Sequence, residues 1–181
     1  MSRPEADVSV RVAWADDAAA IAALQVRAWA EQYGELLPAG ALPDEEQAAA
    51  RWHASLQRPP DARVRVLVAL ERARVVGYAI TAPATDPDRD PVSDGEVLDL
   101  TVAPAERGRG HGSRLLQACA DTLVADRFSR AVTWAIAGDD ALRAFLTSAG
   151  WEVDSAHRAL DLDGSGEVVV KQVRLHTDLG S

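Results

Sequence analysis

The sequence predicts a single α/β domain, built on one mixed, mostly antiparallel β-sheet with helices on both of its faces. Its 181 residues are the usual length of one domain. Apolar strand patterns alternate along the chain with segments of helical periodicity, and no internal repeat or long linker separates them. We therefore expect one domain over residues 1–181, with its core over about residues 8–175.

The first predicted elements are a strand and two helices. Val8–Ala13 alternates apolar and polar residues, as a strand does. Two aspartates then precede Ala18–Tyr33, where apolar residues recur at helical spacing and a side-chain cap is available. Pro43 and the three acids that follow it are typical of a helix start, which predicts a second helix to about Leu56.

The rest of the chain predicts six more strands and two more helices. Val64–Leu70 and Val75–Thr81 read as an antiparallel pair that turns around Glu71–Arg74, followed by a loop rich in proline and aspartate. A glycine at position 150 matches the end of the last helix. The remaining elements are Glu96–Val102, Gly110–Ala125, Ala131–Ile136, a helix from Asp139 or Asp140 to Gly150, Glu152–Asp161 and Glu167–Leu175.

Composition excludes several classes of protein. The chain has 28 acidic and 19 basic residues and a net charge of −9, which disfavours a nucleic-acid binder. One cysteine, Cys119, excludes an internal disulfide and a multi-cysteine zinc site, and the four histidines have no metal-ligand spacing. Because no apolar run approaches a membrane span and no secretory signal is visible, we expect a cytoplasmic protein without a metal or membrane partner.

The most informative segment lies between Glu96 and Ser113, where a strand ends, a glycine-rich turn follows and a helix starts. The first N–H groups of a helix lack internal partners, and glycines let a bulky anion approach them. This pattern predicts a cradle for phosphate or pyrophosphate. A P-loop is excluded because this segment contains no lysine, and a dinucleotide fingerprint is disfavoured because Ser113 occupies the position of its third glycine.

The run Arg107-Gly108-Arg109-Gly110-His111-Gly112, with the strand and proline before it, resembles the acetyl-CoA signature of the GCN5-related N-acetyltransferase (GNAT) superfamily. The resemblance extends over most of the chain and implies acetyl-CoA-dependent transfer to an amine. In that family the turn's backbone amides hold the pyrophosphate and the preceding strand pairs with the pantetheine arm. The cofactor-binding residues that this implies are Leu100, Thr101, Val102, Arg107, Gly108, Arg109, Gly110, His111, Gly112, Ser113 and Asp139.

The resemblance also implies catalytic residues. Glu96 matches a position that often carries a catalytic or water-ordering glutamate, and the Val102 amide matches the oxyanion donor. Asp99, which strand alternation places on the face opposite Glu96, is a second candidate. The family's general-acid tyrosine aligns with Leu146, whose side chain has no acidic proton to donate, so Tyr33 is considered for that role.

The acceptor site is expected between the first two helices and the sheet, with Trp29, Tyr33 and Trp52 as candidate lining residues, of which at least one is expected to be ordinary aromatic core. The aspartates of the loop before Glu96 either attract a cationic acceptor or are simply solvated. The expected partners are acetyl-CoA, a small-molecule or peptide amine, and a second copy of the chain through the last hairpin. The alternative function is a non-catalytic acyl-CoA-binding sensor or interaction module.

Overall fold

The computed structural model describes residues 7–180 and contains one seven-stranded sheet in the order β1-β2-β3-β4-β5-β7-β6. Neighbouring strands are antiparallel except β4 and β5, which are parallel. This confirms the predicted mixed, mostly antiparallel sheet. The strands are β1 (Val8–Val12), β2 (Arg65–Glu71), β3 (Arg74–Pro83), β4 (Asp94–Val102), β5 (Arg130–Ile136), β6 (Glu152–Asp161) and β7 (Val169–Asp178).

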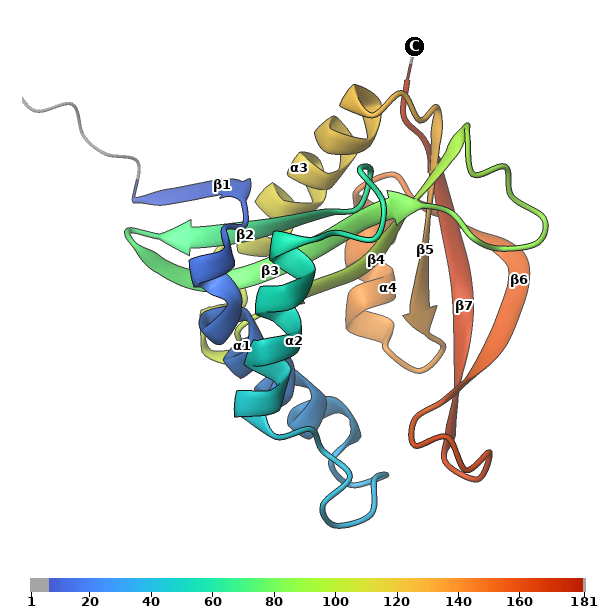
Figure 1. Ribbon diagram of the computed structural model, residues 1–181. Helices are drawn as coiled ribbons and strands as arrows, with labels where there is room; N and C mark the ends of the chain where they lie inside the picture. Colours follow the sequence, from blue (N-terminus) through green and yellow to red (C-terminus); the bar gives the residue numbers. More distant parts are fainter. Residues whose placement is uncertain (1–6, 181) are drawn as a thin grey trace, which may run out of the picture.

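Helices cover both faces of the sheet, as predicted (Figure 1). The helices are α1 (Ala18–Tyr33), α2 (Glu45–Gln57), α3 (His111–Ala125) and α4 (Asp140–Ser148), with short 3-10 turns η1 (Ala15–Asp17) and η2 (Pro104–Glu106). None of the helices in residues 7–180 is long and apolar enough to cross a membrane.

Two apolar clusters, one on each face, hold these layers together. On β2, Leu67 belongs to the cluster under α3 and α4, while its neighbour Val68 belongs to the cluster under α1 and α2. Successive strand residues point to opposite faces, so a continuous apolar strand such as β2 joins both helical layers. Between β1 and β4, α1 and α2 cover one face, and they leave the β5–β7 part of that face without a helix (Figure 1).

Local signals explain where several elements begin. The Asp44 carboxylate accepts a hydrogen bond from the Gln47 N–H at 3.1 Å, which caps α2. At α4, the Asp139 carboxylate accepts from the Leu142 N–H at 3.0 Å in the same way. The Glu71–Arg74 turn joins β2 to β3 with Arg72 at a positive φ of 57°.

Candidate active site

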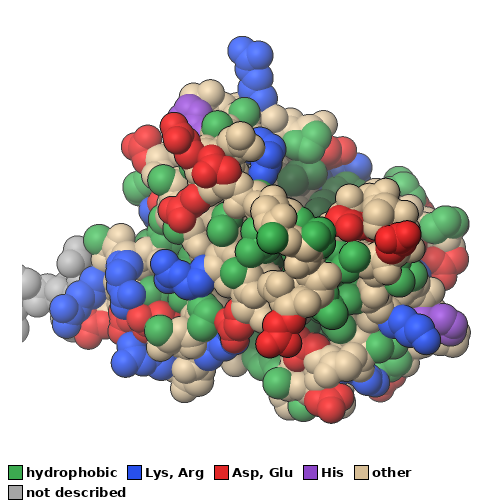
Figure 2. Space-filling model, turned by 90° about the horizontal axis from the view of Figure 1, so that it is seen from below, with side chains coloured by type: hydrophobic (Ala, Val, Ile, Leu, Met, Phe, Trp, Pro, Cys, Tyr) green, Lys and Arg blue, Asp and Glu red, His purple; other side chains and the backbone are tan. Residues whose placement is uncertain are grey.

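The candidate site is a cleft at the point where β4 and β5 separate. The two strands pair only from Asp94 to Val97 on β4, and the Thr133 hydroxyl donates to the Val97 carbonyl at 2.8 Å at the last paired position. Beyond this point the strands diverge and a cleft of about 920 Å³ opens, lined by the ends of both strands, the glycine loop, α1 and α4. Seen from below, apolar side chains gather in the middle of the surface, with acidic side chains around them (Figure 2).

The free edge of β4 presents backbone groups to this cleft. On the other side of β4, the Ala103 N–H donates to the Val76 carbonyl of β3 at 2.8 Å, and Val102 lies opposite Gly77. In an antiparallel ladder Val102 and Gly77 are therefore a pair without mutual hydrogen bonds, and the N–H of Val102 points away from β3. Alternation gives the N–H and carbonyl of Leu100 the same direction, and both residues line the cleft.

A tight glycine turn leads from β4 into α3. Gly108 and Gly110 have φ values of 79° and 84°, in the left-handed region that favours glycine. Gly110 is the residue before α3 and supplies no side-chain cap, so the first N–H groups of α3 stay free to bind an anion. Gly112 and Ser113, in the first turn, line the cleft.

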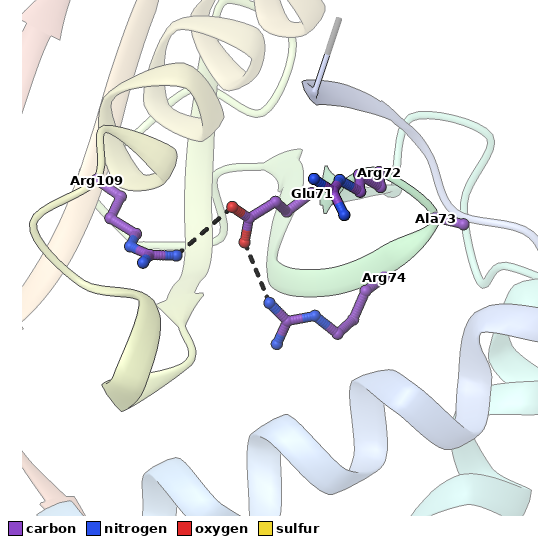
Figure 3. Close-up of a pocket in the computed structure, with 5 residues that line it drawn as sticks. All are labelled: Glu71, Arg72, Ala73, Arg74 and Arg109. Atoms are coloured by element: carbon purple, nitrogen blue, oxygen red, sulfur yellow. Dashed lines mark hydrogen bonds and ion pairs between the residues drawn. The ribbon is translucent and has the colours of Figure 1, made fainter. Parts of the chain in front are cut away.

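The side chain of Arg109 does not line the cleft. It lies behind the turn and pairs with Glu71 at 3.5 Å, and Arg74 pairs with the same carboxylate (Figure 3). Both arginines also pair with Glu106, each at 2.9 Å. The hydrogen bond from Arg74 lowers the pKa of Glu106. Of the two arginines that the resemblance implies as cofactor-binding, Arg109 is therefore neutralised on the far side of the turn. The other, Arg107, lines the cleft and forms an exposed pair with Glu31 at 2.9 Å.

His111 takes part in a cluster that its sequence position does not reveal. It is 2% exposed, and a ring nitrogen lies with carboxylate oxygens of Glu71 and Glu106 in a group whose members are within 4.8 Å of one another. Its Nε2 has no hydrogen-bond partner within residues 7–180. Arginines already balance both carboxylates, and this balance disfavours a cation. The histidine was singled out in the sequence only as part of the glycine turn.

Glu96 and Asp99, the two candidate catalytic carboxylates of β4, lie on the same face of the sheet, contrary to the prediction from strand alternation. Between Val97, which pairs with Thr81, and Asp99, which pairs with Ile80, the β4 strand has one extra residue, Leu98. This bulge shifts the alternation by one position. Asp99 consequently points to the face that Glu96 occupies, and Leu98 is left exposed in the cleft.

Asp99 lines the cleft and is held rigidly. Its two carboxylate oxygens accept hydrogen bonds from the Tyr78 hydroxyl at 2.7 Å and the Thr101 hydroxyl at 2.8 Å. Burial raises the pKa of Asp99, although both hydroxyls and the Leu100 N–H oppose this rise. Because Tyr78 is fully buried, the anchor of this carboxylate cannot move away easily.

Glu96 lies deeper, beside the cleft, and does not line it. It is 4% exposed, and burial together with the charge of Asp86 raises its pKa to about 7. The positive charges of Arg158 and Arg174 oppose that rise. A carboxylate with a pKa near neutrality can accept and release protons at the pH where amine chemistry runs.

Tyr33 lies at the C-terminal end of α1 and lines the cleft. Burial, followed by the charges of Asp99 and Asp139, raises the pKa of its hydroxyl, which therefore keeps its proton. Leu146 of α4 is also in the cleft wall, and an apolar side chain there supplies no proton. The Asp139 side chain caps α4 at the same rim.

Of the three aromatic residues expected near the acceptor, two are in the cleft. Trp29 lines it and makes an edge-to-face contact with Tyr33 at 6.2 Å between ring centroids. Trp52 is the one that belongs to the core: its ring packs on Tyr78, with 5.4 Å between ring centroids, and its indole N–H donates to Gln25 at 3.0 Å. Trp52 points inward because α2 packs its buried face against α1 and the sheet.

The aspartate loop between β3 and β4 is neither a free acidic patch nor a simply solvated one. Arg174 of β7, whose side chain is 4% exposed, donates to Asp86, Asp88 and Asp154 at 3.0, 2.6 and 2.7 Å. The Trp134 indole N–H also donates to Asp86, at 3.2 Å. The loop is thus tied to β5, β6 and β7 beside the cleft.

Comparison with known proteins gives consistent results. Residues 20–151 match the model of the Acetyltransferase (GNAT) family. No curated protein matches the sequence.

Solved structures share the fold over nearly the whole chain. The ribosomal-protein-alanine N-acetyltransferase from Brucella melitensis is 23% identical with a TM-score of 0.72, over 94% of this chain and 99% of that one. The structure of yncA from Salmonella typhimurium with its cofactor acetyl-CoA is 20% identical with a TM-score of 0.68, over 97% and 95%. The PaiA N-acetyltransferase from Thermoplasma acidophilum, in complex with coenzyme A, is 13% identical with a TM-score of 0.68, over 94% and 98%.

Proposed function

The chain belongs to the GNAT acetyltransferase family, and on that premise we propose that it transfers the acetyl group of acetyl-CoA to a primary amine by direct attack. The observation that carries the proposal is the glycine turn, because its uncapped N–H groups open into the same cleft as the free edge of β4. This combination suits a long ligand that has a pyrophosphate at one end and an amide-containing arm at the other.

The residues of the turn fit acetyl-CoA in charge and space. The free N–H groups at the start of α3 would bind the pyrophosphate, and Gly112 leaves room for it because it has no side chain. The outward backbone groups of Leu100 and Val102 would pair with the pantetheine arm. The likeness in fold to yncA with acetyl-CoA and to PaiA with coenzyme A supports this assignment.

Bound acetyl-CoA supplies the acetyl thioester, and the protein's own groups then have three tasks. The amine must lose a proton, because an ordinary alkyl ammonium has a pKa near ~10.4. We assign this proton to Glu96, reached through one intervening water, because its pKa of about 7 suits a base and it does not line the cleft itself. Asp99 would hold the incoming ammonium group by its charge.

The other two tasks concern the oxyanion and the leaving group. The outward N–H of Val102 would donate to the oxyanion that forms on the acetyl carbonyl. As the nitrogen–carbon bond forms and the carbon–sulfur bond breaks, Tyr33 would give its proton to the departing thiolate. Its raised pKa favours the protonated form that an acid requires.

Titration calorimetry with acetyl-CoA, with NAD as the control ligand, tests the binding half of this proposal. Selective binding of acetyl-CoA is expected, and binding of neither ligand would overturn it. Release of free thiol with a panel of amines then tests turnover.

Glu96→Gln and Asp99→Asn form a matched pair that separates the base from the ammonium site. With Glu96 as the base, kcat/KM of the wild-type protein rises with pH through about 7, because the carboxylate must be ionised to accept a proton. Glu96→Gln is expected to lower the rate roughly 100-fold and abolish this rise, whereas Asp99→Asn keeps it and raises KM. If the rise of kcat/KM with pH persists in Glu96→Gln and disappears in Asp99→Asn, then Asp99 is the base and Glu96 belongs to the ammonium site.

Leu146 favours a second candidate function, a non-catalytic acyl-CoA-binding sensor. It is in the cleft wall at the position where the family resemblance implies a tyrosine acid. Tight binding of acetyl-CoA without thiol release from any amine would support the sensor and exclude the transferase.

A further inference from the structure

Arg158 carries a positive charge at the β6–β7 side of the cleft. It lies on β6 directly opposite Gln172 of β7, and both residues line the cleft with Trp134 of β5. This part of the sheet face has no helix over it (Figure 1). The guanidinium group therefore faces open space rather than a packed layer.

Neighbouring side chains hold this guanidinium in one orientation. Its Nε donates to the Gln172 side-chain oxygen at 2.7 Å, and Gln172 is 8% exposed. Its Cζ lies 4.2 Å from the ring centroid of Trp134, a stacking distance. These contacts occupy Nε and one face of the group, and they leave the two terminal nitrogens for another partner.

No acidic side chain in residues 7–180 forms an ion pair with Arg158. The nearby acids are already taken: Asp86 and Asp154 bind Arg174, and Asp154 also binds Arg89 at 3.0 Å. Arg107, the other arginine that lines the cleft, pairs with Glu31. In a chain of net charge −9, an oriented arginine without a carboxylate partner in a cleft is an anion site that the fold itself leaves open.

We propose that the amine acceptor is a small zwitterion, whose anionic group binds the two terminal nitrogens of Arg158 while its ammonium group binds near Asp99. This inference rests on the proposed transferase function and names its substrate class. A planar guanidinium matches the two oxygens of a carboxylate, and phosphonate shares that chemistry. A polyamine would place a second positive charge against Arg158 and is disfavoured.

The test compares acceptors that differ only in the anionic group. Thiol release from acetyl-CoA is measured with several amino acids, their α-carboxamides, an aminoalkyl phosphonate and spermidine, at equal concentrations of free amine. The wild-type protein is expected to prefer the anionic acceptor of each pair by roughly 10- to 100-fold in kcat/KM, as for a charge-assisted hydrogen bond.

Arg158→Gln is expected to remove that preference by raising KM for anionic acceptors, with little effect on the carboxamides at a pH where Glu96 is ionised in both proteins. Arg158→Lys keeps the positive charge but lacks the paired N–H donors of the guanidinium group, so it should retain part of the preference for anionic acceptors. Arg130→Gln, which removes an arginine outside the cleft, is the matched control and should change kcat/KM neither for the anionic acceptors nor for the carboxamides. Loss of Arg158 should also shift the pH profile upward, because its charge favours ionised Glu96.

The outcomes separate this inference from the function on which it rests. Equal or faster turnover of carboxamides or spermidine, unchanged in Arg158→Gln, would overturn the zwitterion and leave the transferase intact. Binding of acetyl-CoA without thiol release from any acceptor would overturn both.

Discussion

Replacing Gly112 by alanine separates the fold of the glycine turn from its proposed use as a phosphate cradle. A Cβ at this position would lie 3.6 Å from Cζ of Phe145 and 3.8 Å from Cγ2 of Val102, which are ordinary contact distances. The backbone of Gly112 is not left-handed, so alanine fits without strain. Because alanine is the better helix former by up to about 1 kcal/mol, the variant should be as stable as the wild type or melt roughly 2–4 °C higher.

The same methyl group should nevertheless weaken acetyl-CoA binding. It would stand in the cleft beside the N–H that is proposed to meet a pyrophosphate oxygen. Loss of one charge-assisted hydrogen bond costs about 1.5–3 kcal/mol, which corresponds to a Kd roughly 10- to 150-fold higher. We therefore expect an unchanged or raised Tm together with weaker binding of acetyl-CoA.

Calorimetric titration and thermal unfolding without ligand measure the two quantities independently. Gly138→Ala is the matched control, because its Cβ would meet nothing within 4 Å and Gly138 does not line the cleft. An unchanged Kd for acetyl-CoA in a stable Gly112→Ala protein would refute the phosphate cradle. The variant would be folded, so the result would mean that a methyl group at this position disturbs no contact with the ligand. A bulkier Gly112→Trp should then also bind normally, whereas the proposal expects it to lose binding.

Two further predictions concern groups outside the reaction. Arg174→Leu should lower the free energy of unfolding by about 3–5 kcal/mol in chemical denaturation, because Asp86 loses its arginine partner and Asp154 keeps only Arg89. The hydrogen bond from Arg174 lowers the pKa of Asp88 to about 2, so the part of the stabilisation that comes from the Arg174–Asp88 pair is present above pH ~4 and is lost as pH falls through about 2; a difference from the wild type as large at pH 2 as at pH 7 would contradict it. Cys119 is buried with a pKa raised to about 12, so its thiol should react with Ellman's reagent only after unfolding, and immediate labelling of the folded protein would contradict this.

Local signals made most of the fold predictable. The predicted helix Ala18–Tyr33 has the same bounds in the structure, and the predicted start of the second helix matches the Asp44 cap. Both depend on residues close together in sequence, where periodicity and capping act. The glycine turn was also visible, because left-handed backbone needs glycine and the structure has it at Gly108 and Gly110.

Features that depend on distant residues were not predictable in this way. The bulge at Leu98 leaves no mark in the composition of β4, yet it moves Asp99 to the other face. The partner of Asp86 and Asp88 is Arg174, more than 80 residues later, so the loop read as an acidic patch. Tertiary pairing decides both cases, and one sequence contains no local signal for it.

The proton for the leaving thiolate shows how these two kinds of information combine. The family resemblance places Leu146 where an acid is expected, and the structure puts that leucine in the cleft wall. Tyr33, from the other end of the chain, enters the same cleft, and the charges of Asp99 and Asp139 act on its hydroxyl. Burial raises the pKa of Tyr33 and those negative charges raise it further, for the same reason that they would attract an ammonium group, so one electrostatic field would serve both the proposed acceptor and the proposed acid. A catalytic position that is empty on one element can thus be supplied by another, because the reaction requires a proton at a place in the cleft and not at a place in the sequence.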